Sequence, residues 1–301
     1  MNKQPPVGLA RETAKTFRIF IIDDTHVEGT ETVNLVLSSP TNNAILGAQS
    51  IVALSIADND TVVSGVNPID RVEFFVRQQY VDFLIREPDL VGNTEWQRVL
   101  NTCTNQGGLG ADPACDRVHV SSGFFRSPEF QGRGYFVYRF YETSFGRRPQ
   151  YAEFIPDMQR VSGSQTLEQE EASKQAFVRD FMARADFRSQ YDNLSNVGFV
   201  DELICIAGVT LANRNELVAD LEANRRTRAE ILRAVVESQA VYVRFYNRAF
   251  VAMQYFGYLR RDPDEAGYAE WVRVLDTTGD FRHMIFGFIY STEYRGRFAQ
   301  P

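Results

Sequence analysis

The chain has 301 residues, enough for two domains, and 44% of them are hydrophobic, so a sizeable core can form. Its formal net charge of −7 argues against general nucleic-acid binding, which needs a basic surface to meet phosphate groups. The sequence has no apolar run long enough to cross a bilayer, and residues 1–10 lack the apolar stretch of a signal peptide.

Three segments between residues 16 and 60 predict β-strands, because hydrophobic side chains recur there with a period of two. The alternating hydrophobic residues are Phe17, Ile19 and Ile21, then Val33, Leu35 and Leu37, then Val52, Leu54 and Ile56. So few strands cannot close a sandwich, and their open edges invite pairing with another chain. We therefore expect a partial antiparallel β-sandwich over residues 1–60.

The hydrophobic period changes near residue 65. Val72, Phe75 and Phe83 recur at helical spacing, and strand signals are few from there to the C-terminus. The sequence thus predicts a mainly α protein, with a linker at residues 61–68 and an all-helical repeat domain over residues 69–301.

Four short motifs punctuate the strand segment. They are Asp23-Asp24, Glu28-Gly29-Thr30-Glu31, Leu37-Ser38-Ser39-Pro40 and Asp58-Asn59-Asp60. Together they resemble the C-terminal part of a Calx-beta domain, a seven-stranded β-sandwich. The resemblance implies that the first strands are missing from this chain. It also implies an extracellular or membrane-associated protein that binds calcium.

The acidic residues of these motifs are the candidate metal ligands. They are Asp23, Asp24, Glu28, Asp58 and Asp60. If the Calx-beta resemblance holds, their carboxylates meet at one end of the sandwich and hold calcium, which takes several oxygen ligands. In the alternative interpretation, Asp and Asn only shape turns through local hydrogen bonds. The sequence leaves both open, and calcium is the cofactor to test.

Two stretches of the helical region occur twice. YVDFLIREPDLVGNTEWQRVL at residues 80–100 matches YFGYLRRDPDEAGYAEWVRVL at residues 255–275, which lies 175 residues further on. GFFRSPEFQGR at residues 123–133 matches GFIYSTEYRGR at residues 287–297, which lies 164 residues further on. The first copy therefore carries an insertion of 11 residues between its two motifs.

Both tryptophans of the chain occupy the same place in this repeat. We expect the two full copies to superpose as pseudo-symmetric halves of one domain, with Trp96 and Trp271 buried in equivalent places. A weaker third copy starts at YETSFGRRPQYAEF, residues 141–154, and a more degenerate one covers residues 199–237.

The residue types of the repeated motif suit helix ends. Asp262 can cap the helix that follows it, and Pro263 suits the first helical position. Ser127 is expected to cap a short helix that starts at Pro128. The motif arginine can pair with the acidic turn residues. We interpret the motif as structural.

The motif Y-x-x-x-L-x-R-x-P-D-x-x-G-x-x-x-W, followed by S-P-E-F, resembles the domain-of-unknown-function family 4214 of bacterial surface and secreted proteins. It is more distantly similar to the helical repeats of phycobilisome linker proteins. The resemblance covers residues 66–298, although the last copy has Ser-Thr-Glu-Tyr in place of S-P-E-F. It implies a helical fold and a place at the cell surface or outside the cell, and it implies no activity.

The three cysteines lack the paired spacing of a zinc site. Cys103 and Cys115 flank the Gly-rich insertion, and we expect them to form a disulfide under oxidising conditions. The alternative is two free thiols in a cytosolic protein, where disulfides are rare. We expect Cys205, in an apolar stretch, to be buried and unpaired.

The sequence carries no recognised catalytic motif, and we expect a protein that is not an enzyme. Glu95 and Glu270 could be taken for a carboxylate pair, but they are equivalent positions of two repeats. The first hypothesis is a structural or adhesive surface module that binds another protein. The second is an accessory module that binds carbohydrate or another surface polymer. An exposed row of aromatic residues would favour the second.

Overall fold

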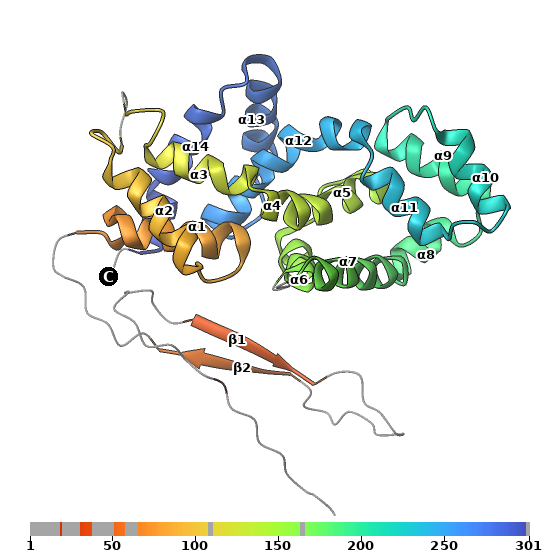
Figure 1. The fold of residues 1–301 in the computed structure, drawn as a ribbon, viewed down its shortest axis with the longest axis horizontal. Coiled ribbons are helices and arrows are strands. Elements are labelled where there is room, and N and C mark those ends of the chain that lie inside the picture. Colours follow the sequence, from red (N-terminus) through yellow and green to blue (C-terminus); the bar gives the residue numbers. More distant parts are fainter. Residues whose placement is uncertain are drawn as a thin grey trace, which may run out of the picture. The chain divides into compact units, whose positions relative to one another are not determined.

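The computed structural model describes residues 19, 31–37, 51–57, 66–107, 111–162 and 166–298. The chain divides into two compact units, Met1–Val62 and Val63–Pro301. Figure 1 shows a β-ribbon in the first unit and an array of helices in the second.

The first unit contains two antiparallel strands, β1 (Glu31–Val36) and β2 (Ile51–Ile56). Val33 lies opposite Leu54 in their register, so both strands occur where the alternating pattern predicts them. The strand expected around Ile19 falls almost entirely outside the described residues. No β-sandwich is shown: the described part of this unit is a two-stranded sheet, and two short strands cannot enclose a core.

The second unit is helical, as predicted, and its helices follow one another as four repeats. Repeat 1 has η1 (Pro68–Asp70), α1 (Val72–Leu84), α2 (Leu90–Asn101), α3 (Arg117–Arg126) and α4 (Pro128–Gly132). Repeat 2 has α5 (Gly134–Phe145), α6 (Tyr151–Val161), α7 (Leu167–Met182) and α8 (Ala185–Tyr191). Repeat 3 has α9 (Asn196–Ala207), α10 (Arg214–Glu222) and α11 (Arg228–Val236). Repeat 4 has α12 (Gln239–Gln254), the π-helical turn η2 (Tyr255–Leu259), α13 (Glu265–Thr278), α14 (Phe281–Ile289) and α15 (Thr292–Gly296). None of the described helices combines the length and apolar character that spanning a membrane requires.

The first long helix of every repeat ends in the same backbone conformation. The residue that follows the helix adopts the left-handed backbone conformation in each case: Ile85 (φ 54°), Gly146 (φ 65°), Gly208 (φ 61°) and Arg260 (φ 52°). Glycine adopts this conformation without steric cost, whereas Ile85 and Arg260 are strained there. The shared geometry marks the start of one turn, which recurs four times.

Equivalent parts of repeats 1 and 4 lie against each other. The ring of Phe83 on α1 meets the ring of Tyr258 on η2, its own counterpart 175 residues later, with centroids 5.1 Å apart. α3 packs against α14, which is also its counterpart. Contacts between equivalent positions are characteristic of a two-fold arrangement. In repeats 2 and 3, the equivalent helices α5 and α9 pack together in the same way, as do α7 and α11.

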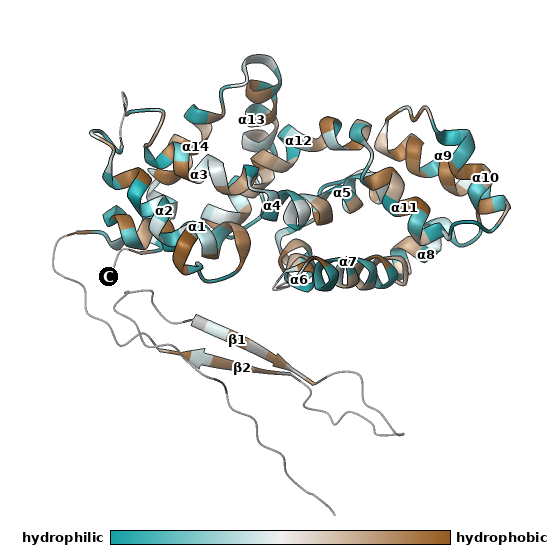
Figure 2. Ribbon diagram, viewed as in Figure 1, coloured by the Kyte–Doolittle hydropathy of each residue, from teal (hydrophilic) through white to brown (hydrophobic). Residues whose placement is uncertain are grey.

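Aromatic side chains dominate the core of the helical unit. Phe75, Phe125 and Tyr138 are fully buried. Figure 2 shows hydrophobic and hydrophilic residues interleaved along the helices of this unit. Trp96 and Trp271 occupy equivalent helices, but both are half-buried, not buried as expected. Each lies on the second helix of its repeat, which covers the core from outside.

Candidate functional site

The five candidate calcium ligands lie outside the described residues. They are Asp23, Asp24, Glu28, Asp58 and Asp60. The structure therefore bears on neither interpretation of this acidic cluster, and calcium binding stays a prediction.

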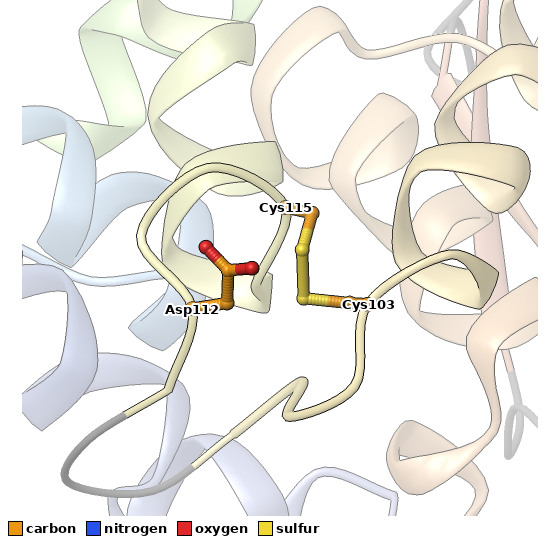
Figure 3. A group of neighbouring side chains, drawn as sticks. All are labelled: Cys103, Asp112 and Cys115. Atoms are coloured by element: carbon orange, nitrogen blue, oxygen red, sulfur yellow. A yellow bond between two sulfur atoms is a disulfide. The ribbon is translucent and has the colours of Figure 1, made fainter.

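The predicted disulfide between Cys103 and Cys115 is present, with the Cα atoms 5.5 Å apart. Figure 3 shows Asp112 beside the two sulfur atoms, a grouping that could suggest a metal site. Metals bind cysteine as the thiolate, and here the sulfurs are bonded to each other. Asp112 instead shapes the loop, since its carboxylate accepts a hydrogen bond from the Ala114 N–H (3.0 Å).

The disulfide-closed insertion joins repeat 1 to repeat 4. Gly107 lies directly beneath the Tyr290 hydroxyl, where any side chain would collide with it. Asp116, buried at the start of α3, forms an ion pair with Arg282 of α14. The insertion is thus part of the packing between these two repeats.

Cys205 is free, as expected, but it is exposed, so the prediction of burial was wrong. It lies on α9, whose buried residues include Leu203 and Ala207. A residue two positions after Leu203 turns about 200° around the helix and therefore faces away from the core. The residues around Cys205 are nearly all apolar, so the sequence shows no helical periodicity that would place Cys205 on the outer side.

An ion pair links the two halves of the repeated motif in both full copies. Arg86 donates to both carboxylate oxygens of Glu129, at 2.7 and 2.8 Å. Arg261 contacts Glu293 in the same bidentate manner, at 2.6 and 3.0 Å. The motif arginine was expected to pair with acidic turn residues. Its main partner is the glutamate of S-P-E-F, and Asp89 of the turn is a weaker one, at 3.4 Å.

The motif tyrosine lies beside the same arginine. Arg86 lies 5.0 Å from the ring centre of Tyr80, and Arg261 lies 5.5 Å from that of Tyr255. Arg147 of repeat 2 lies 5.4 Å from the ring of Tyr141, which is attractive because the ring face carries negative charge. Three of the four repeats therefore use their tyrosine and arginine to hold their own helices together.

The motif aspartate caps the second helix. Asp89 accepts a hydrogen bond from the Gly92 N–H (2.8 Å), and Asp264 accepts one from the Gly267 N–H (2.7 Å). The expected cap, Asp262, lies two residues too early. Its carboxylate instead accepts from the backbone N–H of Tyr151, the first residue of α6 in repeat 2. The expected Ser127 cap of α4 is confirmed, because its hydroxyl accepts from the Phe130 N–H (3.1 Å).

The contact between Asp262 and Tyr151 belongs to a joint between the motif turns of repeats 2 and 4. In the opposite direction, Arg148 of the repeat 2 turn forms an ion pair with Glu265 of repeat 4. Arg148 and Asp262 are equivalent positions of the motif, as are Tyr151 and Glu265. The two turns therefore hold each other through reciprocal contacts.

A buried polar network lies beneath this joint. Glu142 is 3% exposed and accepts a hydrogen bond from the Tyr138 hydroxyl (2.8 Å), which lies 3.2 Å from that of Tyr268. Burial raises the pKa of Glu142, and it raises the pKa of Tyr268 to about 12. Arg248 approaches the Glu142 carboxylate at 3.6 Å. Arg148 of the joint lies 4.5 Å from the centre of the Tyr268 ring, so the network contacts the joint directly.

A cleft of about 890 Å³ opens beside the joint, between the α5–α6 turn and α13. Two of its arginines are engaged within the protein: Arg147 pairs with Glu153 (2.7 Å), and Arg273 pairs with Glu270 (2.6 Å). Glu95, the counterpart of Glu270, pairs with Arg98 in repeat 1. The two glutamates therefore make the same contact in their respective repeats.

Comparison with known families matches residues 239–298, which make up repeat 4, to the domain of unknown function DUF4214. No Calx-beta domain is found. No curated protein and no solved structure matches the chain.

Proposed function

We propose that this chain is a non-enzymatic structural or adhesive module of a secreted or cell-surface bacterial protein, and that its helical repeats bind another protein. The main observation behind the proposal is that the motif residues make their contacts inside their own repeat. The tyrosine, arginine, aspartate and glutamate of the motif contact one another within each full repeat, as Arg86 does with Glu129. The motif thus builds a rigid helical scaffold.

The disulfide supports a place outside the cytosol. Cys103 and Cys115 are bonded in a segment that repeat 4 lacks. Disulfides persist in oxidising surroundings such as the periplasm and the cell exterior, and the cytosol keeps thiols reduced.

Binding of carbohydrate or another polymer is the alternative, and the aromatic residues favour protein binding over it. Among the described residues, no Phe, Tyr or Trp is exposed, so these residues form no exposed row on the surface. Sugar-binding modules of the kind considered would need such rings for stacking, because a ring face offers flat apolar surface.

A binding assay separates the two roles. The purified chain is labelled and added to the cells that produce it, to the same cells after protease treatment, and to their isolated polysaccharides. Protein binding predicts retention on intact cells and its loss after protease treatment. Retention on the isolated polysaccharide, unaffected by protease, would contradict the proposal and support the alternative.

We further propose that the first unit is a Calx-beta-like domain that calcium stiffens. The proposed ligands are the five acidic residues named above, whose like charges would repel one another without a cation. The affinity is expected to be low, on the order of 10⁻⁴ to 10⁻³ M, as for other extracellular calcium-binding modules. Calorimetry should show calcium binding, with magnesium a poor substitute. Equal heats for the parent and for Asp24→Asn would contradict it.

A further inference from the structure

Two apolar side chains lie fully on the surface at the motif turn of repeat 1. Leu90 and Val91, the first two residues of α2, are 83% and 73% exposed. The N–H of Leu90 has no partner within its own helix, because the first helical residues lack one. Glu87, three residues earlier, is also exposed and pairs with Arg77 of the same repeat (2.6 Å).

The equivalent position contacts another turn in repeats 2 and 4, and it is half-buried in repeat 2 and exposed in repeat 4. Tyr151 is the counterpart of Leu90 in repeat 2, and its ring packs 5.8 Å from that of Phe256 in repeat 4. Its N–H donates to Asp262, which is the repeat 4 counterpart of Glu87. Glu265, the counterpart of Leu90 in repeat 4, pairs in return with Arg148 of repeat 2. The turns of repeats 2 and 4 therefore pair with each other through reciprocal contacts.

We propose that the repeat 1 turn pairs with the repeat 1 turn of a second copy of this chain. Leu90 and Val91 of the two copies would cover each other, and the Glu87 carboxylate of each copy would accept from the Leu90 N–H of the other, as Asp262 does from Tyr151. The result is a closed homodimer with an isologous interface. This inference rests on the proposed interaction role and names its partner.

The second copy is the favoured occupant because the joint inside the chain already shows the complementary geometry. Its contacts join position 87 of one turn to position 90 of the other, in both directions. Repeat 1 carries both halves of this contact, Glu87 and Leu90, on one surface. The apolar area is small, so the dimer is weak, well below the size of a permanent interface.

Sedimentation velocity of the purified full chain tests the proposal, over loading concentrations from about 10 to about 500 μM. A reversible monomer–dimer equilibrium is expected. The double substitution Leu90→Glu and Val91→Ala gives repeat 1 the residues that repeat 4 carries as Glu265 and Ala266, so the same helix start accommodates them. It should weaken the dimer at least tenfold, because the new carboxylate faces the Glu87 of the partner.

A matched control is available at the start of α7. Leu167 is likewise the first residue of its helix and is 87% exposed. Leu167→Glu adds the same charge in the same helical position on a different surface. It should leave the association constant within twofold of the parent value.

A charge exchange identifies the contact itself. Adding Glu87→Arg to Leu90→Glu places a guanidinium opposite a carboxylate at both ends of the proposed interface, as Arg148 lies opposite Glu265. The dimer should recover to within threefold of the parent, and circular dichroism checks that each variant is folded.

Three outcomes would overturn the proposal. They are a chain that stays monomeric at the highest concentration, equal weakening by the Leu90→Glu and Val91→Ala double substitution and by Leu167→Glu, and open-ended oligomers instead of a dimer. The last would indicate that the repeat 1 turn pairs with a different turn of the next molecule, such as the one after α9. A monomeric chain that is still retained on intact cells would overturn only the dimer, whereas a dimer that is not retained on cells would overturn only the adhesive role.

Discussion

Alanine substitutions of Gly123 and Gly287 should have opposite effects, although the two glycines are equivalent positions of repeats 1 and 4. A Cβ at Gly123, on α3, would come within 2.7 Å of the far edge of the Trp96 ring, whereas a Cβ at Gly287, on α14, meets nothing within 4 Å. Trp96 packs against Gly123, but Trp271 stands clear of its counterpart Gly287.

The expected magnitudes follow from two opposing terms. Alanine in a helix interior is favoured over glycine by about 0.5–1 kcal/mol. Forcing an extra methyl into a filled space costs about 1–3 kcal/mol. Gly287→Ala gains the helix preference for alanine without a steric cost, so it should stabilise the protein by about 0.5–1 kcal/mol. Gly123→Ala is subject to both terms and should destabilise the protein by up to about 2.5 kcal/mol, because the Trp96 ring also touches Phe124, with centroids 5.6 Å apart, and has little freedom to move.

Chemical denaturation, followed by the helical circular dichroism signal, measures both variants against the parent. Tryptophan fluorescence should change on Gly123→Ala and remain unchanged on Gly287→Ala. If both substitutions shifted the unfolding midpoint in the same direction by the same amount, the difference in packing between α2–α3 and α13–α14 would be refuted.

Removing the motif ion pair should destabilise the protein more in repeat 1 than in repeat 4, because both partners are more buried in repeat 1. In denaturant titrations, Glu129→Gln should lower the free energy of unfolding by about 1 kcal/mol, and Glu293→Gln by roughly half that. Burial raises the pKa of Glu142 in the folded protein above its value in the unfolded chain. The free energy of unfolding therefore falls as the pH rises from the unfolded pKa to the folded pKa, where the buried carboxyl ionises. Glu142→Gln should therefore raise the melting temperature at pH 7, with the gain vanishing below the ordinary carboxyl pKa; a gain that grew on acidification would contradict this. Replacing Cys103 and Cys115 with serine should lower stability by roughly 3 kcal/mol on the loop-entropy argument, and an unchanged midpoint would count against it.

Much of the helical fold could be predicted from the sequence, because residues close together in each motif determine where its helices begin and end. Each motif carries its own helix ends, and the S-P-E-F segment places Ser127 and its cap where the residue types predict them. The cap of α13 was placed two residues early because both Asp262 and Asp264 are suitable caps. The helix begins later because the Asp264 carboxylate accepts from the Gly267 N–H, while the Asp262 carboxylate accepts from the Tyr151 N–H of repeat 2.

The joint between repeats 2 and 4 could not be predicted, because it depends on which repeats meet in space. The weak resemblance of residues 141–154 to the full motif did align Arg148 with Asp262. Nothing in that alignment indicates that the two turns contact each other. The exposure of Cys205 was not predicted for a related reason. In a continuous apolar run, the sequence does not indicate which side of the helix faces the core.

The most direct test of the central claim, an interaction module that works outside the cytosol, is thiol trapping in the cells that produce the protein. Intact cells are treated with an alkylating reagent, fractionated, and analysed by mass spectrometry of non-reduced peptides. Cys205, free and exposed, reports whether the reagent reached the protein. The account predicts the chain in the surface or extracellular fraction, with Cys205 alkylated and a linked peptide containing Cys103 and Cys115. A chain found in the cytosol with all three cysteines alkylated would contradict it.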